Sequence, residues 1–139
     1  MGWGGRAARA VAAGMVATAA LAVAAPAQAP GFVALSALQR GEWQLREVGG
    51  ATRSLCLTDP AALFQQRHRG AQCSRFVIEN GATSATVHYT CPGTGHARTT
   101  VEVATPRSVH VSSQGLEGGM PFDIEIEARR TGACAIAGR

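Results

Sequence analysis

The feature that most constrains this chain is a strict alternation of apolar and polar residues in several short segments. It is clearest over residues 122–130, where the apolar positions are Phe122, Ile124, Ile126 and Ala128. The intervening positions carry Asp123, Glu125, Glu127 and Arg129. Since successive side chains of a strand point to opposite faces of a sheet, this pattern predicts a half-buried β-strand.

Other short segments with β-type patterning, separated by turn-forming residues, predict further strands over residues 42–48, 53–57, 75–79, 83–91, 97–104 and 107–113. Asn80-Gly81 is typical of a hairpin turn. Residues 115–121 are predicted to form a loose, glycine-rich loop. Many short strands with regular turns predict a mainly β fold, a curved antiparallel meander that resembles a half-barrel or a sandwich.

One short helix is predicted between two of these strands. Asp59 suits the N-cap and Pro60 the first helical position. The helix is expected to run through residues 61–67 and to end near Gly70. The apolar stretch over residues 32–38 is expected to form a helical turn that covers an edge of the sheet.

The first 27 residues have the three parts of a secretory signal peptide. Arg6 and Arg9 precede an uncharged run over residues 10–25, and Ala25 and Ala27 supply the small residues of a cleavage site. We expect a leader helix that is cleaved after Ala27, with no membrane span afterwards. An uncleaved anchor is the alternative, but it needs about 20 strongly apolar residues, and this run is shorter and mostly alanine.

The chain therefore divides into four parts. These are a signal peptide (1–27), a linker and lead-in (28–40), a single β-domain (41–134) and a C-terminal tail (135–139). The expected location is the periplasm of a bacterium, or the medium outside it.

All four cysteines follow the leader, and an even number in an exported chain predicts two disulfides. Zinc is not expected, because at least 16 residues separate successive cysteines, whereas structural zinc sites use close pairs. Three pairings are possible. We favour Cys56–Cys73, which would close a short helical excursion, and Cys91–Cys134, which would tie a central strand to the end of the chain.

The charge balance argues against a nucleic-acid partner. Of the 13 basic residues, all arginine, two lie in the leader; 13 less 2 leaves 11 against nine acids in the mature chain. Nucleic-acid binding needs a basic stripe, which this sequence lacks. Residues 67–69, Arg-His-Arg, are expected to form part of a solvated face.

Matching the inward residues of adjacent strands predicts a polar row on the opposite face of the sheet. If Val87 faces Val101, and Val101 faces Val109, the row consists of His88, Thr100, His110 and an acid, either Asp123 or Glu125. The two histidines would lie two strands apart, too far for one metal ion, and no third histidine is near. We interpret the pair of His110 and the acid as a surface contact. Such a contact could depend on pH, because histidine changes its charge near neutral pH.

No catalytic constellation is evident, so we expect a protein that is not an enzyme and needs no cofactor. There is no G-x-S-x-G motif, and oxidised cysteines lack a reactive thiolate. Glu125 and Glu127 share a face about 7 Å apart along a strand, a spacing that invites comparison with a glycosidase, but an acidic stripe on an exposed sheet explains them more simply.

Short motifs in this chain resemble those of the small exported proteobacterial proteins grouped as domain of unknown function 3617. They are Gly41-Glu42-Trp43, Leu55-Cys56-Leu57 ahead of Thr58-Asp59-Pro60, Cys73, Tyr89-Thr90-Cys91 and the closing residues 129–134. The resemblance covers residues 38–134. It implies an exported β-rich domain with paired cysteines, and it implies no activity.

The sequence thus favours a non-enzymatic periplasmic binding module whose partner is a small apolar ligand or another periplasmic protein. A ligand binder should have an apolar cavity lined by Trp43, Tyr89, Val101 and Phe122. The alternative is an inhibitor or envelope-stress factor that acts on a periplasmic protein, for which the loop over residues 115–121 should protrude.

Overall fold

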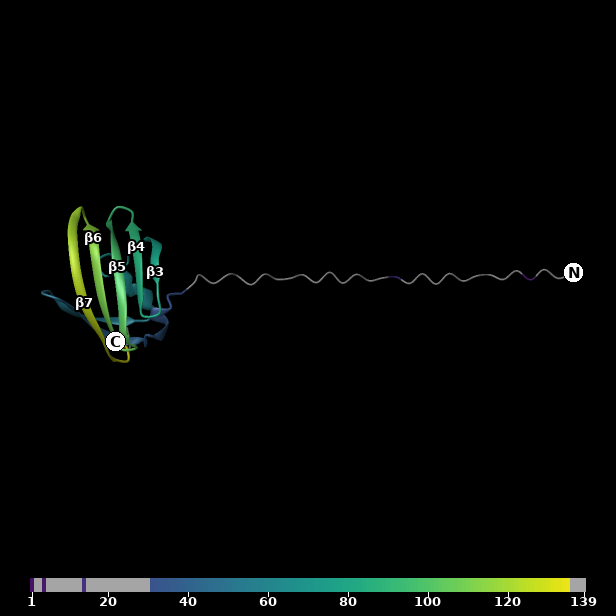
Figure 1. Cartoon of the computed structure of the whole chain (residues 1–139), viewed down its shortest axis with the longest axis horizontal. Helices are drawn as coiled ribbons and strands as arrows, with labels where there is room; N and C mark the ends of the chain where they lie inside the picture. Colours follow the sequence, from purple (N-terminus) through teal and green to yellow (C-terminus); the bar gives the residue numbers. More distant parts are fainter. Residues whose placement is uncertain (2–3, 5–13, 15–30, 136–139) are drawn as a thin grey trace.

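The computed structural model describes residues 1, 4, 14 and 31–135 of the chain. The predicted leader helix, the start of the linker and the end of the tail lie outside the described residues. The domain consists of seven strands in one open antiparallel sheet (Figure 1), which confirms the predicted mainly β fold. The strands are β1 (Gly41–Glu47), β2 (Thr52–Leu57), β3 (Ser74–Asn80), β4 (Ser84–Cys91), β5 (Gly95–Thr105), β6 (Ser108–Glu117) and β7 (Met120–Gly132).

The order of the strands in the sheet is β2-β1-β7-β6-β5-β4-β3. Strands β3 to β7 form a simple meander, and the β1–β2 hairpin adds to its last strand. The first and last strands of the domain therefore lie side by side, while β2 and β3 form the two edges.

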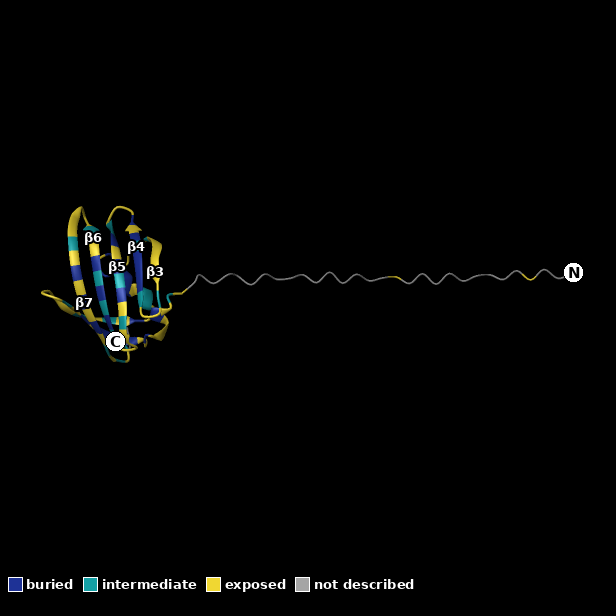
Figure 2. Cartoon of the chain, viewed as in Figure 1, coloured by how far each residue is buried: buried dark blue, intermediate teal, exposed yellow. Residues whose placement is uncertain are grey.

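One face of the sheet is apolar and buried, and the other is polar. Along β7, for example, Ile124, Ile126 and Ala128 are buried and the residues between them are exposed (Figure 2). Two 3-10 helices, η1 (Ala34–Ala37) and η2 (Pro60–Gln65), cover the buried face over β4, β5 and β6. The core lies between this thin cover and the sheet, and its largest fully buried side chains include Trp43, Tyr89 and Phe64.

The predicted start of the short helix after Asp59 is confirmed in η2, although η2 is a 3-10 helix and shorter than expected. The carboxylate of Asp59 accepts a hydrogen bond of 2.9 Å from the backbone N–H of Ala61, as an N-cap does. Leu63 and Phe64 are buried beneath it. Because the segment has to bury these two residues and then return to β3, it ends after six residues, about two turns of a 3-10 helix.

The predicted glycine-rich loop over residues 115–121 is wrong. Strand β6 continues to Glu117 and β7 begins at Met120, so only Gly118 and Gly119 turn the chain, with φ angles of +57° and +80°. Gly115 is a strand residue because a Cβ there would clash with the backbone of β5 at His96. The glycine that suggested a loop instead permits a close approach between two strands.

The favoured disulfide pairing is also wrong. The bonds are Cys56–Cys134 and Cys73–Cys91, with Cα–Cα distances of 5.4 and 4.2 Å. Strand pairing explains both. Ser74 pairs with Thr90, so their neighbours Cys73 and Cys91 come next in the same register.

The other bond follows from the contact between the first hairpin and the last strand. Glu42 of β1 lies opposite Cys56 on one side and opposite Gly132 of β7 on the other. The chain that leaves β7 can therefore pass the end of β1 and bring Cys134 to Cys56. Nearness in sequence suggested Cys56–Cys73 instead, because the position of β7 beside β1 was unknown.

A tryptic digest under non-reducing conditions will separate these possibilities. Arginines lie between all successive cysteines, so each cysteine falls in a different peptide. We expect mass spectrometry to find the peptide of Cys56 joined to that of Cys134, and the peptide of Cys73 joined to that of Cys91. A Cys56–Cys73 linked peptide from the native protein would contradict the fold.

Candidate functional site

The predicted polar row exists in part, with a shift of register. Val101 lies opposite Ala85 and Val111, not opposite Val87 and Val109. The row that contains Thr100 therefore consists of Thr86, Thr100, Ser112 and Glu125. His88 and His110 lie on the same face in other rows. Alternation settles which face a residue occupies but not which residue it pairs with, and each strand is displaced by two positions.

This outer face carries isolated polar contacts and no convergent site. Nε2 of His110 lies 3.8 Å from Oε2 of Glu125, and Arg46 pairs with Glu127. Exposed pairs of this kind contribute under about 1 kcal/mol each. A shallow hollow of about 170 Å³ lies on the same face, lined by Arg98, Thr100, Ser112, Ser113, Gln114 and Asp123. Within the described residues, no three His, Cys, Asp or Glu side chains gather closely enough to hold a metal ion.

The four residues predicted to line an apolar cavity are in or beside the packed core. Trp43, Tyr89 and Val101 are 0% exposed. The indole N–H of Trp43 donates to the carbonyl oxygen of Gln39 at 3.0 Å. Phe122 is partly buried beneath the guanidinium of Arg67, which lies 5.6 Å from its ring centre. The two hollows around η2 are lined by other residues.

A buried polar cluster that the sequence did not indicate joins the covering segment to the sheet. His68 is only 4% exposed. Its Nε2 lies 3.1 Å from the carbonyl oxygen of Leu116 and its Nδ1 lies 2.8 Å from the hydroxyl of Tyr89. Since a carbonyl can only accept, Nε2 carries the proton, and in the neutral ring Nδ1 accepts from Tyr89. The flanking arginines made His68 resemble a surface residue.

Strand β3 forms the most exposed apolar feature of the domain. All seven of its residues are exposed, and three consecutive large apolar side chains stand at its centre: Phe76 (70%), Val77 (47%) and Ile78 (44%). Exposed Val33 adjoins one end, where its backbone N–H donates to Asn80 at 2.9 Å. In the sequence, such a run is typical of a buried central strand; only the topology places it at an edge.

A groove with a basic rim lies on the covered side, around the start of η2. It consists of two adjoining hollows of about 290 and 440 Å³, both bordered by Asp59 and Arg75. The smaller hollow is also lined by Leu55, Ala62, Gln65, Gln66, Arg69 and Gly70. The larger is also lined by Gly31, Phe32, Leu35, Ser36, Leu38, Arg40, Pro60 and Ala61.

Arg53 contacts the lining of the smaller hollow through Gln66. One of its guanidinium nitrogens, Nη2, donates to the side-chain oxygen of Gln66, and the other, Nη1, is buried without a hydrogen-bond partner among the described residues. Burial lowers the pKa of Arg53, and the neighbouring charges of Arg69 and Arg67 lower it further, against the opposing effect of Glu47. This part of the domain therefore has an excess of positive charge.

One open antiparallel sheet, covered on one face by two 3-10 helices and joined by two disulfides, defines a small disulfide-stabilised β-domain. The chain belongs to the family described as protein of unknown function (DUF3617), which matches residues 33–134. The resemblance seen in the sequence motifs is thereby confirmed. No curated protein and no solved structure matches the chain significantly.

The buried cluster predicts an alkaline limit to stability. The pKa of Tyr89 is raised from 10.0 to about 12, mainly by burial; the hydrogen bond with Ser113 opposes this rise and the nearby charge of Glu117 adds to it. Because the folded-state pKa is raised, this contribution to stability is complete below pH 10 and is lost as the pH rises through about 12.

Tyr89 is the single tyrosine of the chain, so an ultraviolet titration of tyrosinate reports this residue alone. We expect its ionisation to occur well above the ordinary tyrosine pKa and together with loss of the native Trp43 fluorescence. A Tyr89→Phe variant gives the baseline. Ionisation near pH 10 in protein with native fluorescence would contradict the buried hydrogen bond.

Proposed function

We propose that the chain is an exported, non-enzymatic binding module that holds a partner protein through the edge strand β3. The observation that carries this proposal is the exposed run of Phe76, Val77 and Ile78 on an edge strand, which pairs with β4 on one side only. Native proteins usually protect such edges with charges, proline, bulges or a covering segment. Here a bulge between Val77 and Glu79 interrupts the pairing with β4, yet the apolar side chains remain open to solvent.

The partner's contribution is an extended segment with apolar side chains. An edge strand offers free backbone N–H and C=O groups, and an added strand gains affinity from these and specificity from alternate side chains. Phe76 neighbours His88 of β4 on the outer face, whereas Val77 neighbours the buried Val87. An incoming strand can therefore extend both the polar face and the core of the sheet.

Two features support export. Residues 1–27 have the pattern of a leader, with Arg6 and Arg9 ahead of an uncharged run. The two disulfides of the chain are consistent with an oxidising compartment. Among the described residues, no helix is both long and apolar enough to cross a membrane. The inhibitor alternative predicted a protruding loop over residues 115–121, and the short turn at Gly118-Gly119 gives that alternative no specific support.

Expression of the full chain in a bacterium tests the export step. We expect the periplasmic fraction to contain a protein that begins at Gln28 and whose intact mass corresponds to two disulfides. Ala27→Arg should block cleavage, because the signal peptidase requires a small residue before the cut. Recovery of uncleaved, reduced protein from the cytoplasm would contradict the proposed location.

The β3 contact can be tested by selecting displayed random peptides on the exported, oxidised protein. We expect selected peptides to contain alternating apolar residues and to protect backbone amides of residues 74–80 from hydrogen exchange. Phe76→Lys should weaken their binding about tenfold or more, as loss of a central apolar contact does. Met120→Lys is the matched control, since Phe76 and Met120 are both 70% exposed.

Three results would overturn the proposal. The first is a selection that yields no binding peptide, and the second is a set of peptides that bind Phe76→Lys as tightly as the native protein. The third is a homodimer in sedimentation that Phe76→Lys dissociates, which would identify a second copy of the chain as the occupant of this edge.

A further inference from the structure

The groove around η2 has features of a ligand site that are independent of β3 pairing. Its lining is mainly apolar in the larger hollow, where Phe32, Leu35 and Leu38 face Pro60 and Ala61. Its two parts meet at Asp59 and Arg75, which border both. The two hollows therefore adjoin at one acid and one arginine, and together they form an open groove on the covered side.

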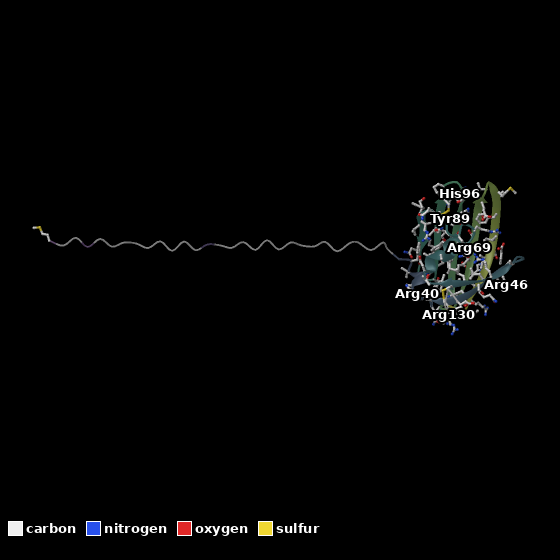
Figure 3. The ribbon with its side chains drawn as sticks, turned by 180° about the vertical axis from the view of Figure 1, so that it is seen from behind. Arg40, Arg46, Arg69, Tyr89, His96 and Arg130 are labelled. Atoms are coloured by element: carbon white, nitrogen blue, oxygen red, sulfur yellow. A yellow bond between two sulfur atoms is a disulfide. The ribbon has the colours of Figure 1, made fainter. Side chains whose placement is uncertain are left out.

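Positive charge dominates the rim of this groove. Arg40 borders the larger hollow, Arg69 the smaller, and Arg75 both (Figure 3 labels Arg40 and Arg69). Asp59 is the only acid in either lining, and its carboxylate is already bonded to the backbone of Ala61. Arg75 donates to the side chain of Gln65 at 2.8 and 3.2 Å, so it too has a partner.

Arg69 differs from Arg75 in having no such partner. Its side chain makes no hydrogen bond and no ion pair with any residue of the described part of the chain. Among the described residues, Nη1 of Arg53 is buried and unbonded, and Gln66 connects Arg53 to the lining of the smaller hollow. Arg69 is thus a guanidinium without a bonded anion at this end of the groove, and Arg53, whose neighbours include both Arg69 and Glu47, lies near it.

We propose that this groove binds a single-chain carboxylate amphiphile, a molecule of the fatty-acid class, with its carboxylate on Arg69 and its chain along the apolar lining toward Leu35. The charge complementarity is direct, because the rim carries three arginines and one acid that is already engaged. A carboxylate at Arg69 also offsets the repulsion between Arg69 and Arg53 that contributes to the lowered pKa of Arg53. This inference goes beyond the protein contact on β3 and does not depend on it.

Titration calorimetry with decanoate below its micelle concentration tests the site on the exported, oxidised protein. We expect saturable binding of one decanoate per chain. Arg69→Gln should weaken it about tenfold or more, because a charge-assisted hydrogen bond is lost. Arg129→Gln is the matched control, since Arg129 lies on the outer face, where it pairs across the strands with Gln44, and carries the same charge.

Two further probes separate the chain from the head group. Decanol should bind at least about tenfold more weakly than decanoate, since it lacks the charge. Ala62→Trp should abolish binding by filling the smaller hollow, and its near-ultraviolet circular dichroism shows whether the fold is kept. If this variant does not fold, Arg69→Gln and the decanol comparison still decide the question.

The proposal is overturned if decanoate does not bind, if Arg69→Gln binds it unchanged, or if decanol binds equally well. Competition by inorganic phosphate at equal affinity would also overturn it, since the site would then recognise an anion without a chain. Phe76→Lys should leave decanoate binding unchanged and Arg69→Gln should leave peptide binding unchanged, so the failure of either proposal is visible separately.

Discussion

The structure depends on burying one face of a single sheet under a cover that has little regular structure. The sheet supplies a continuous apolar surface, but the regular structure that covers it is limited to the two short 3-10 helices η1 and η2. Short helices of this kind have little stability of their own. The cover must therefore be held by specific links: the cap of Asp59, the Cys73–Cys91 bond where the cover joins β3, and the buried contact between His68 and Tyr89.

The two disulfides act on different parts of this problem. The Cys73–Cys91 bond closes a separation of 18 residues and fixes the return of the cover onto the meander. The Cys56–Cys134 bond closes a separation of 78 residues and joins the edge strand β2 to the end of β7. By loop entropy the shorter bond contributes about 3 kcal/mol and the longer about 4.5 kcal/mol, comparable to the net stability of a small domain. The longer bond also reinforces the least local contact of the fold, that between β1 and β7.

Alternation made the strands and their buried faces predictable from the sequence. Ile124, Ile126 and Ala128 are buried as expected, and Asp59 caps its helix. Alternation could not settle the register, because a shift of two residues preserves every face; this is why the row expected at Thr100 holds Ser112 in place of His110. The disulfide pairing needed the position of β7 beside β1, which no local pattern encodes. His68 was missed because its burial depends on a partner 21 residues away.

The two edges of the sheet differ in how much apolar side chain they expose. Strand β2 alternates exposed and partly buried residues, exposes no large apolar side chain, and is bonded through Cys56 to the chain after β7. Strand β3 is preceded by the bonded Cys73, and its central apolar side chains are exposed. If these apolar side chains served only to stabilise the fold, they would be expected to be buried, because an exposed apolar run on a free edge favours aggregation.

The same strand supplies Arg75, which is bonded to η2 and borders both hollows of the groove. The open edge and the basic groove are therefore neighbouring surfaces of one element, joined through a side chain that belongs to both.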